Sequence, residues 1–311
     1  MESLAPVLLP AGSPPAAQAL YGIGYLFIFI FVLSSMFGTG LSVTLQDLLA
    51  PVRNRRLLAV ALLANFILVP LLALVLITLI PLNEELAGGL LLLSIAAGAP
   101  STMKVAQVID GNIARAVSLA ILMTLVTIIL MPLLLPFILP GMQADPLEVA
   151  GYLVVLVLIP ILLGLLLRNR SGWIAERLMP VMDYVSDISI LVIFLTIGIV
   201  FLLRMGGFAT TSSGTLAILA AVLFIPGTLW LGYLAGSLAR ESREEITFGA
   251  GFRNITAALV VIFASFLTAG NDVLLMVLMV TLVSVVIVSV LVSIIYLRRF
   301  GTARLRARLG I

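Results

Sequence analysis

The amino-acid sequence predicts an all-α integral membrane protein with nine transmembrane helices, because it is strongly apolar, contains long apolar segments and restricts its charges to their ends. Of the 311 residues, 62% are hydrophobic and only 10% are charged, and the mean hydropathy is +1.30. Soluble domains contain about 45–50% apolar and about 25% charged residues. The chain therefore lacks the polar residues needed to cover a water-exposed surface, and it is too apolar to be intrinsically disordered.

The nine helices are predicted from segments of about 20 apolar residues, the length that crosses the hydrocarbon core. These segments are residues 20–44, 57–80, 86–109, 113–139, 149–167, 181–203, 215–238, 245–267 and 272–297. Short connections rich in Pro, Gly and charged residues separate most of them. We therefore expect one membrane-embedded unit at 20–297, with short tails at 1–19 and 298–311.

The distribution of Lys and Arg predicts the orientation of these helices. Fourteen of the 17 basic residues fall in the C-terminal tail or in loops that share one side when nine helices alternate, whereas Arg204 alone falls on the other side. We therefore expect a protein of the inner membrane with its N-terminus outside and its C-terminus in the cytoplasm. Residues 1–18 contain no Lys or Arg, which argues against a signal peptide. The arginines of 298–311 are expected to contact anionic lipid rather than nucleic acid.

The residue inventory also excludes several classes of chemistry. The chain contains no Cys and no His, which removes disulfides, thiolate and imidazole metal sites and the common nucleophile–base pairs. The Gly249-Ala-Gly251 pattern lies inside an apolar segment and is not a nucleotide-binding fingerprint. We expect no enzymatic activity, no resident metal and no cofactor.

Two of the predicted helices carry residues that break a helix. In the third segment, Pro100 lacks a backbone donor and Gly98 adds flexibility. In the eighth, Gly249 and Gly251 precede the charged Arg253. Unwound backbone is tolerated at membrane depth only where it faces protein or a wet cavity. Both breaks are therefore predicted to line a binding site.

The broken helices also indicate an inverted repeat. They run in opposite directions in the predicted topology, and each is followed by a helix of similar sequence, at 123–130 and 280–287. Inverted repeats with discontinuous helices are typical of secondary transporters, which hold substrate and coupling ions near the midplane. The sequence thus predicts transport of a small molecule across the bilayer.

The motifs resemble those of the bile acid:sodium symporter superfamily. The matching stretches are 37–41, 65–70, 98–112 and 249–254, and the resemblance runs from about residue 20 to 297. It implies a panel domain (20–44 and 149–203), a core domain (57–139 and 215–297) and a nine-helix form of a ten-helix fold. It also implies that the substrate is a small organic anion, which most members move inward with sodium.

The sequence departs from the sodium-coupled members at their sodium-binding positions. Where those members have Ser-Asn in the first crossing helix, this chain has Thr102 and Met103. Where they have Glu and Gln in the second, it has Gly249 and Arg253. A fixed cation about 5 Å from sodium opposes its binding by roughly 3 kcal/mol at an effective dielectric constant of about 20. We therefore expect that this protein does not use both sodium sites of the family.

Lys104 and Arg253 are the basic residues inside the predicted helices. We hypothesise that they replace the mobile cations, holding the crossing together and attracting an anionic substrate. Arg253 is the first candidate for substrate contact or crossing stabilisation, and Lys104 is the second. Lys104 also lies close enough to the cytoplasmic edge to reach the headgroups instead. If it is buried, proton exchange is an alternative, so sodium or proton coupling stays open.

Further candidates are polar residues near these two cations. Asp187, one turn after Asp183, is a candidate ion-pair partner, although both carboxylates also fit an interfacial position. The remaining candidates for substrate binding or for the crossing are Asn65, Ser101, Thr102, Gln107, Thr124, Asn254 and Thr256. Membrane Ser and Thr hydroxyls commonly bond to their own helix instead.

The sequence therefore predicts a secondary active transporter of a small organic anion that works by alternating access. A conventional sodium-coupled organic anion symporter is one alternative. A membrane sensor or scaffold without flux is another.

Overall fold

The computed structural model describes residues 15–48, 54–138, 145–204, 212–239, 243–265 and 272–301. These residues form helices joined by short connections, and no strand occurs among them. The predicted all-α class is confirmed. Most of the predicted N-terminal tail (1–14) and C-terminal tail (302–311) lies outside the described residues.

The helices follow one another along the chain with two π-helical turns inserted between them and one at the end. They are α1 (Pro15–Leu41), α3 (Arg55–Leu63), η1 (Ala64–Leu68), α4 (Val69–Leu79), α5 (Glu84–Ile95), α6 (Ser101–Val108), α7 (Ile113–Ile138), α8 (Pro146–Leu153), η2 (Val154–Leu158), α9 (Ile159–Arg170), α10 (Gly172–Arg204), α11 (Ser212–Leu238), α12 (Arg243–Gly251), α13 (Ile255–Ser265), α14 (Asp272–Tyr296) and η5 (Leu297–Gly301). The turns η1 and η2 end two residues before Pro70 and Pro160. Since proline lacks the N–H that an α-helical bond requires, a widened turn accommodates it while the span continues.

Eight helical segments of the described residues are long and apolar enough to cross a membrane. They correspond to eight of the nine predicted segments. The other one, 86–109, is one of the two that the sequence predicts to be broken, and it consists of α5 and α6, each too short to cross alone. The predicted boundaries differ in places, since α1 begins at Pro15 rather than at 20 and α10 at Gly172 rather than at 181.

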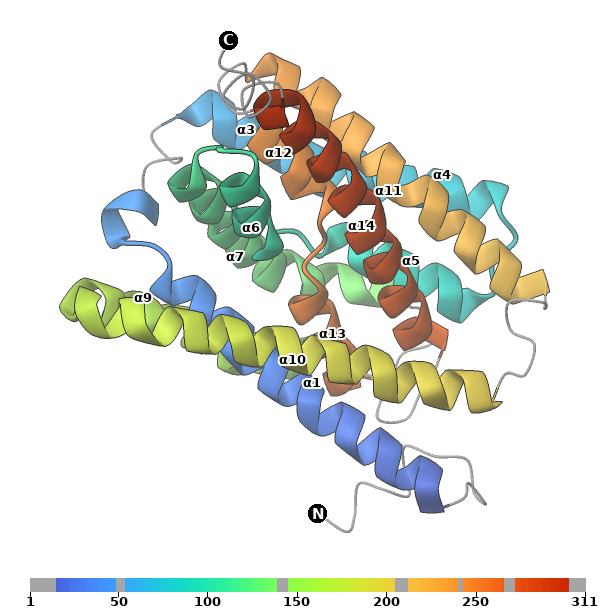
Figure 1. The fold of residues 1–311 in the computed structure, drawn as a ribbon. Coiled ribbons are helices and arrows are strands. Elements are labelled where there is room, and N and C mark those ends of the chain that lie inside the picture. Colours follow the sequence, from blue (N-terminus) through green and yellow to red (C-terminus); the bar gives the residue numbers. More distant parts are fainter. Residues whose placement is uncertain are drawn as a thin grey trace.

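Helices α1, α9 and α10 pack together along one side of the molecule (Figure 1). The crossing of α1 and α9 depends on two glycines. A Cβ on Gly40 would lie 2.1 Å from the carbonyl oxygen of Ile161, and a Cβ on Gly164 would lie 2.4 Å from that of Phe37. The two backbones touch here because neither residue carries a side chain, as in other close crossings of membrane helices.

Most of the other helices form a second group, in which α5 and α12 pack among α4, α7, α11 and α14, while α13 packs against α1 and α8 as well as α14 (Figure 1). Both predicted breaks are present in this group. Residues 96–100 are unwound between α5 and α6, and residues 252–254 are unwound between α12 and α13. These two unwound segments meet near the centre of the molecule.

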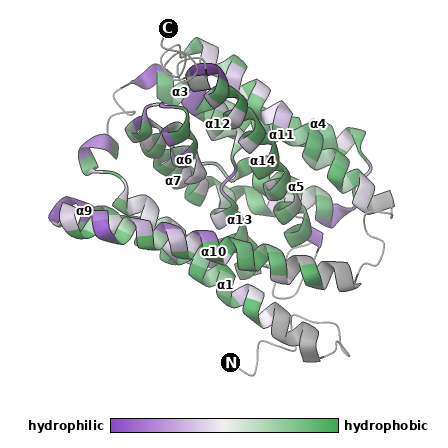
Figure 2. Ribbon diagram, viewed as in Figure 1, coloured by the Kyte–Doolittle hydropathy of each residue, from purple (hydrophilic) through white to green (hydrophobic). Residues whose placement is uncertain are grey.

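The outer surface of the helices matches a lipid environment. Figure 2 shows hydrophobic residues along most helix faces and hydrophilic residues gathered mainly at helix ends. Large apolar side chains such as Leu79, Phe137 and Leu166 are exposed on these faces. An apolar surface of this extent is unfavourable in water and suits a lipid environment. The chain is therefore a multi-pass membrane protein.

Candidate functional site

The two unwound segments are joined to each other by backbone and amide hydrogen bonds. The backbone N–H of Asn254 donates to the carbonyl oxygen of Ala96 at 2.8 Å. The side-chain amide of Asn254 donates to the carbonyl oxygen of Gly98 at 3.1 Å. Its oxygen accepts from the N–H of Ala257 at 3.0 Å and thereby caps α13. Asn254 is completely buried, so this predicted residue forms part of the crossing itself.

Helix α7 supports the first unwound segment with two threonines. The hydroxyl of Thr124 lies 2.8 Å from the carbonyl oxygen of Gly98 and also accepts from the amide of Asn254 at 3.1 Å. The hydroxyl of Thr127 accepts from the N–H of Ala97 at 3.0 Å. Gly98 has a φ of +87°, and a Cβ there would lie 2.4 Å from the hydroxyl oxygen of Thr124. This tight packing requires glycine at the break.

Arg253 is buried at the same crossing, with 6% of its surface exposed. Its Nε donates to the carbonyl oxygen of Leu93 at 3.0 Å, and its Nη2 donates to that of Ser94 at 2.6 Å. These carbonyls belong to the last turn of α5, which is the negative end of its dipole. Its Nη1 donates to Oδ1 of Asn65 at 2.9 Å and lies 3.4 Å from the carbonyl oxygen of Ala250 in α12.

The surroundings of Arg253 therefore consist of oxygen atoms that carry partial rather than full charges. No described carboxylate forms an ion pair with it. Asn65, which lies in the π-helical turn η1, is oriented for Arg253 because its own amide nitrogen donates to the carbonyl oxygen of Ala61 at 3.0 Å. The guanidinium ties α5, α12 and η1 together.

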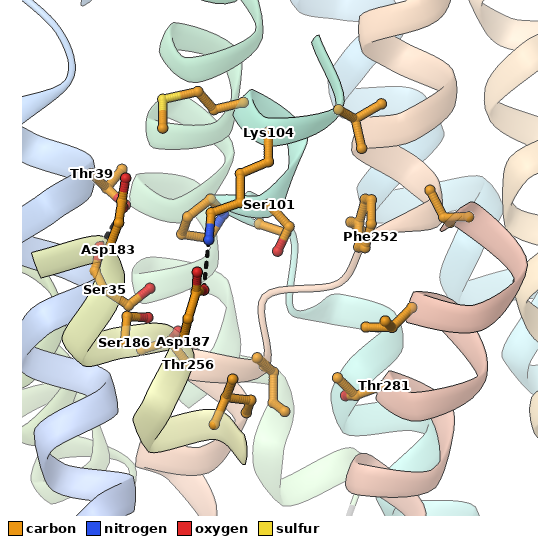
Figure 3. A pocket seen from close by; sticks show the side chains of 18 of the residues that line it. Ser35, Thr39, Ser101, Lys104, Asp183, Ser186, Asp187, Phe252, Thr256 and Thr281 are labelled. Carbon is orange, nitrogen blue, oxygen red and sulfur yellow. Dashed lines mark hydrogen bonds and ion pairs between the residues drawn. The ribbon is translucent and has the colours of Figure 1, made fainter. Parts of the chain in front are cut away.

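A cavity of about 680 Å³ opens beside the crossing, between α1, α6, α10, α13 and α14. Lys104 extends from α6 toward Asp187 of α10, and its Nζ lies 2.6 Å from Oδ1 of that residue (Figure 3). The side chains of this pair remain 47% and 60% exposed. Asp183 lies one turn earlier on α10, beside Ser35 and Thr39 of α1 (Figure 3). The structure thus gives Lys104 a carboxylate partner across the cavity.

The hydroxyls that border this cavity differ in their bonding. Thr281 donates to the carbonyl oxygen of Val277 in its own helix at 2.7 Å. By contrast, Thr256 is buried, and its hydroxyl oxygen has no hydrogen-bond partner among the described residues. Ser101 lines the cavity at the first residue of α6. Thr256 is thus a buried hydroxyl of this wall with unused bonding capacity among the described residues.

Two other sequence candidates lie apart from this cavity. Thr102 faces the interior, and its hydroxyl donates to the carbonyl oxygen of Ala99 at 2.8 Å. Gln107 is exposed near the end of α6 and borders none of the described cavities. Because it lies six residues after Ser101, it is beyond the turn of α6 that reaches the crossing.

Sequence reasoning missed Glu245, which borders a second, small cavity of about 20 Å³ together with Asn65, Gly98, Thr102 and Gly249. Glu245 precedes Gly249 by one turn of α12, and only 9% of its side chain is exposed. Its Oε1 lies 3.9 Å from Nη1 of Arg115. A Cβ on Gly249 would meet no atom within 4 Å. No group of three or more Asp or Glu side chains suited to a metal occurs among the described residues.

Comparison with known proteins identifies relatives of this chain. Residues 28–211, more than half of the chain, match the model of the sodium bile acid symporter family. Over 149 residues the chain is 28% identical to the probable sodium/metabolite cotransporter BASS2, chloroplastic, of Oryza sativa subsp. japonica. This alignment covers 47% of the chain and 35% of that relative, so the chain spans about a third of its length. The family match includes the first broken helix and ends before the second.

Proposed function

Because the chain belongs to the sodium bile acid symporter family, we propose that it is a secondary active transporter that carries a small organic anion by alternating access. The single observation that carries this proposal is the crossing of two broken helices beside a cavity that contains a lysine. Many secondary transporters bind substrate at discontinuous helices near the midplane of the bilayer.

The electrostatics of the cavity favour an anion. The first residues of α6 and α13, Ser101 and Ile255, both line it, so the positive ends of two helix dipoles lie at its wall. Lys104 adds a full positive charge, and Thr256 adds a hydroxyl without a partner among the described residues. An anionic group in contact with Lys104 would gain from all of these features, as anions do at helix N-termini generally.

The moving parts in this proposal are a panel of α1, α8, α9 and α10 and a core of the remaining helices, as the family resemblance implies. The cavity lies between them, since Asp187 belongs to the panel and Lys104 to the core. Rocking of one part against the other would open the cavity alternately to the two sides. The bias of Lys and Arg toward one side supports an inner-membrane location with the C-terminus in the cytoplasm.

Coupling in this protein is proposed not to require both sodium sites of the family. Arg253 takes up the carbonyl oxygens of Leu93, Ser94 and Ala250 and the amide oxygen of Asn65. Oxygens of this kind are the ligands that hard cations prefer. A guanidinium bonded to them occupies these acceptors and supplies a positive charge, which makes the binding of sodium beside it unfavourable.

A conventional sodium-coupled symporter is the second candidate. The family description and the name of the rice relative support it. Glu245 supports it as well, because this buried carboxylate borders a small cavity with Asn65 and Thr102. In that case the carboxylate at Glu245 would take the place of the glutamate that Gly249 replaces.

Transport by the purified protein in proteoliposomes tests the function. Radiolabelled pyruvate, gluconate and glycocholate serve as probes, since all three are monocarboxylates that stay ionised near neutral pH. We expect counterflow of at least one probe with choline as the only external cation. Uptake that requires sodium would favour the second candidate instead. Stabilisation of the protein by a probe without any counterflow would indicate a sensor or scaffold and contradict the proposal.

A further inference from the structure

The charged residues of the large cavity form a balanced set. Lys104 and Arg253 contribute two positive charges, and Asp183 and Asp187 contribute two negative charges. The residues that α1, α13 and α14 contribute to its wall are neutral, such as Thr39, Thr256 and Thr281 (the last of these in α14). The empty cavity therefore carries no net formal charge. Its two cations, however, have different environments.

The two cations of the cavity differ in how firmly their partners hold them. Arg253 is bonded to carbonyl and amide oxygens and is almost fully buried, so its contacts are fixed by the fold. Lys104 has Asp187 as its ion-pair partner, and both side chains are substantially exposed to the cavity. An exposed pair of this kind is weak and exchangeable. An incoming carboxylate can therefore take the place of Asp187 at Lys104.

Displacement of Asp187 has an electrostatic consequence. With a monocarboxylate bound, the cavity would contain three carboxylates and two cations. The freed carboxylate of Asp187 would also lie one helical turn from Asp183, on the same face of α10. The third carboxylate gives the cavity a net negative charge, and two neighbouring carboxylates favour protonation of one of them. Uptake of one proton would restore the charge balance.

We propose that the Lys104–Asp187 ion pair couples transport to protons: the substrate carboxylate displaces Asp187 from Lys104, and Asp187 then binds one proton from water. The proton leaves Asp187 on the opposite side when the anion dissociates and the ion pair forms again. Substrate and proton move together, so the cycle carries no net charge. This inference rests on the proposed function and specifies its coupling ion.

Accumulation driven by a pH gradient tests this coupling in proteoliposomes. The labelled probes are pyruvate, gluconate and glycocholate as choline salts, with protein-free liposomes to subtract passive entry. An external pH about one unit below the internal pH should drive about tenfold accumulation, because each tenfold concentration ratio corresponds to the same free energy. An imposed membrane potential should leave this accumulation unchanged, since the cycle is electroneutral.

The variant Asp187→Asn separates binding from coupling. The amide is close to a protonated aspartate in shape and does not compete for Lys104. Counterflow should therefore saturate at lower probe concentration than in the unmodified protein, while accumulation in response to the pH gradient is lost. Glu176→Gln is the matched control, because Glu176 lies on the same helix, pairs with Arg168 and does not border the cavity. It should retain both activities.

The outcomes distinguish this inference from the proposed function. Absence of counterflow with all three probes would overturn the proposed function, and this inference would fail with it. Counterflow with accumulation driven by a sodium gradient and not by a pH gradient would overturn only the proton coupling. Accumulation by Asp187→Asn equal to that of Glu176→Gln would also exclude Asp187 as the proton carrier.

Discussion

Arg253 and Lys104 are two cations within one membrane protein, yet the structure holds them in opposite ways. Arg253 is 6% exposed and is surrounded by backbone and amide oxygens. Lys104 extends into a cavity and meets a carboxylate on another helix. The negative end of a helix can thus hold a buried cation, since no described carboxylate pairs with Arg253. Such a cation is part of the architecture, whereas Lys104 remains available to a ligand.

The local sequence explains this difference. Arg253 follows Gly251 and Phe252 in an unwound connection, so its side chain extends sideways from the chain to the end of α5. Lys104 lies in the first turn of α6, three residues after Ser101, and shares the face of that helix that borders the cavity. The direction of the Arg253 side chain is therefore set by the unwound backbone, and that of the Lys104 side chain by helical periodicity.

Removal of the Arg253 guanidinium should have the largest effect. In Arg253→Gln, the oxygens of Leu93, Ser94 and Asn65 lose a charged donor inside the protein. Each such bond contributes about 1.5–3 kcal/mol, so we expect a loss of at least about 3 kcal/mol in the free energy of unfolding. Anion uptake should be abolished or become dependent on added sodium. Thermal unfolding in detergent and proteoliposome uptake measure the two effects.

The exposed Arg56 at the start of α3 provides the control for Arg253. Arg56→Gln removes the same charge from the chain without a buried contact, and it should change stability by less than about 0.5 kcal/mol. If Arg253→Gln kept normal stability and uptake independent of cations, the structural role assigned to this arginine would be wrong.

The sequence predicted the breaks of both helices because glycine and proline act locally. Gly98 and Pro100 lie together in one segment, and Gly251 precedes a charged residue in the other, so each break combines a weak helix former with a second local signal. The position of Arg253 deep in an apolar segment is likewise enough to predict that it is buried or functional. These features depend on short-range rules, which a sequence carries directly.

The partners of these residues could not be predicted in the same way. Arg253 is bonded mainly to backbone carbonyls of Leu93 and Ser94, which every residue type possesses. Thr127 and Glu245 reach the site only because α7 and α12 turn these side chains toward the unwound segment of residues 96–100. Helix packing sets that rotation. The pairing of Lys104 with Asp187, 83 positions away, likewise follows from tertiary arrangement, so the sequence offered it only as one alternative.

A smaller effect is expected from Thr127, which supports the same crossing through one bond. Thr127→Val keeps the shape of the side chain but removes the acceptor for the N–H of Ala97. This N–H also approaches the carbonyl oxygen of Ile95, so we expect a loss of about 1 kcal/mol. Thr281→Val is the control, because the hydroxyl of Thr281 bonds to its own helix. Equal melting temperatures for the two variants would show that Thr127 does not hold the break.

Lys104 should show the reverse of the Arg253 pattern, with a functional rather than a structural effect. Lys104→Gln should change the free energy of unfolding by less than about 1 kcal/mol, because exposed ion pairs contribute little. Counterflow of a monocarboxylate should fall about tenfold or more with loss of the charged donor. Lys104→Arg should restore part of it. A large drop in melting temperature with normal counterflow would contradict this assignment, because Lys104 would then have a structural role and no role in binding the anion.

The smallest effect is expected from Glu245, and it tests whether the fixed charge of Arg253 has made sodium unnecessary. A ligand present at about 100 times its dissociation constant stabilises a protein by about 2.7 kcal/mol. If Arg253 serves in place of sodium, exchanging choline chloride for sodium chloride should leave the melting temperature unchanged. Glu245→Gln keeps the shape of this buried side chain and alters a long contact with Arg115 at 3.9 Å, so it should then shift stability by no more than about 1 kcal/mol in either salt. Sodium stabilisation that disappears in Glu245→Gln would instead identify this carboxylate as an ion ligand. It would also show that a mobile cation and a fixed one operate side by side at the crossing.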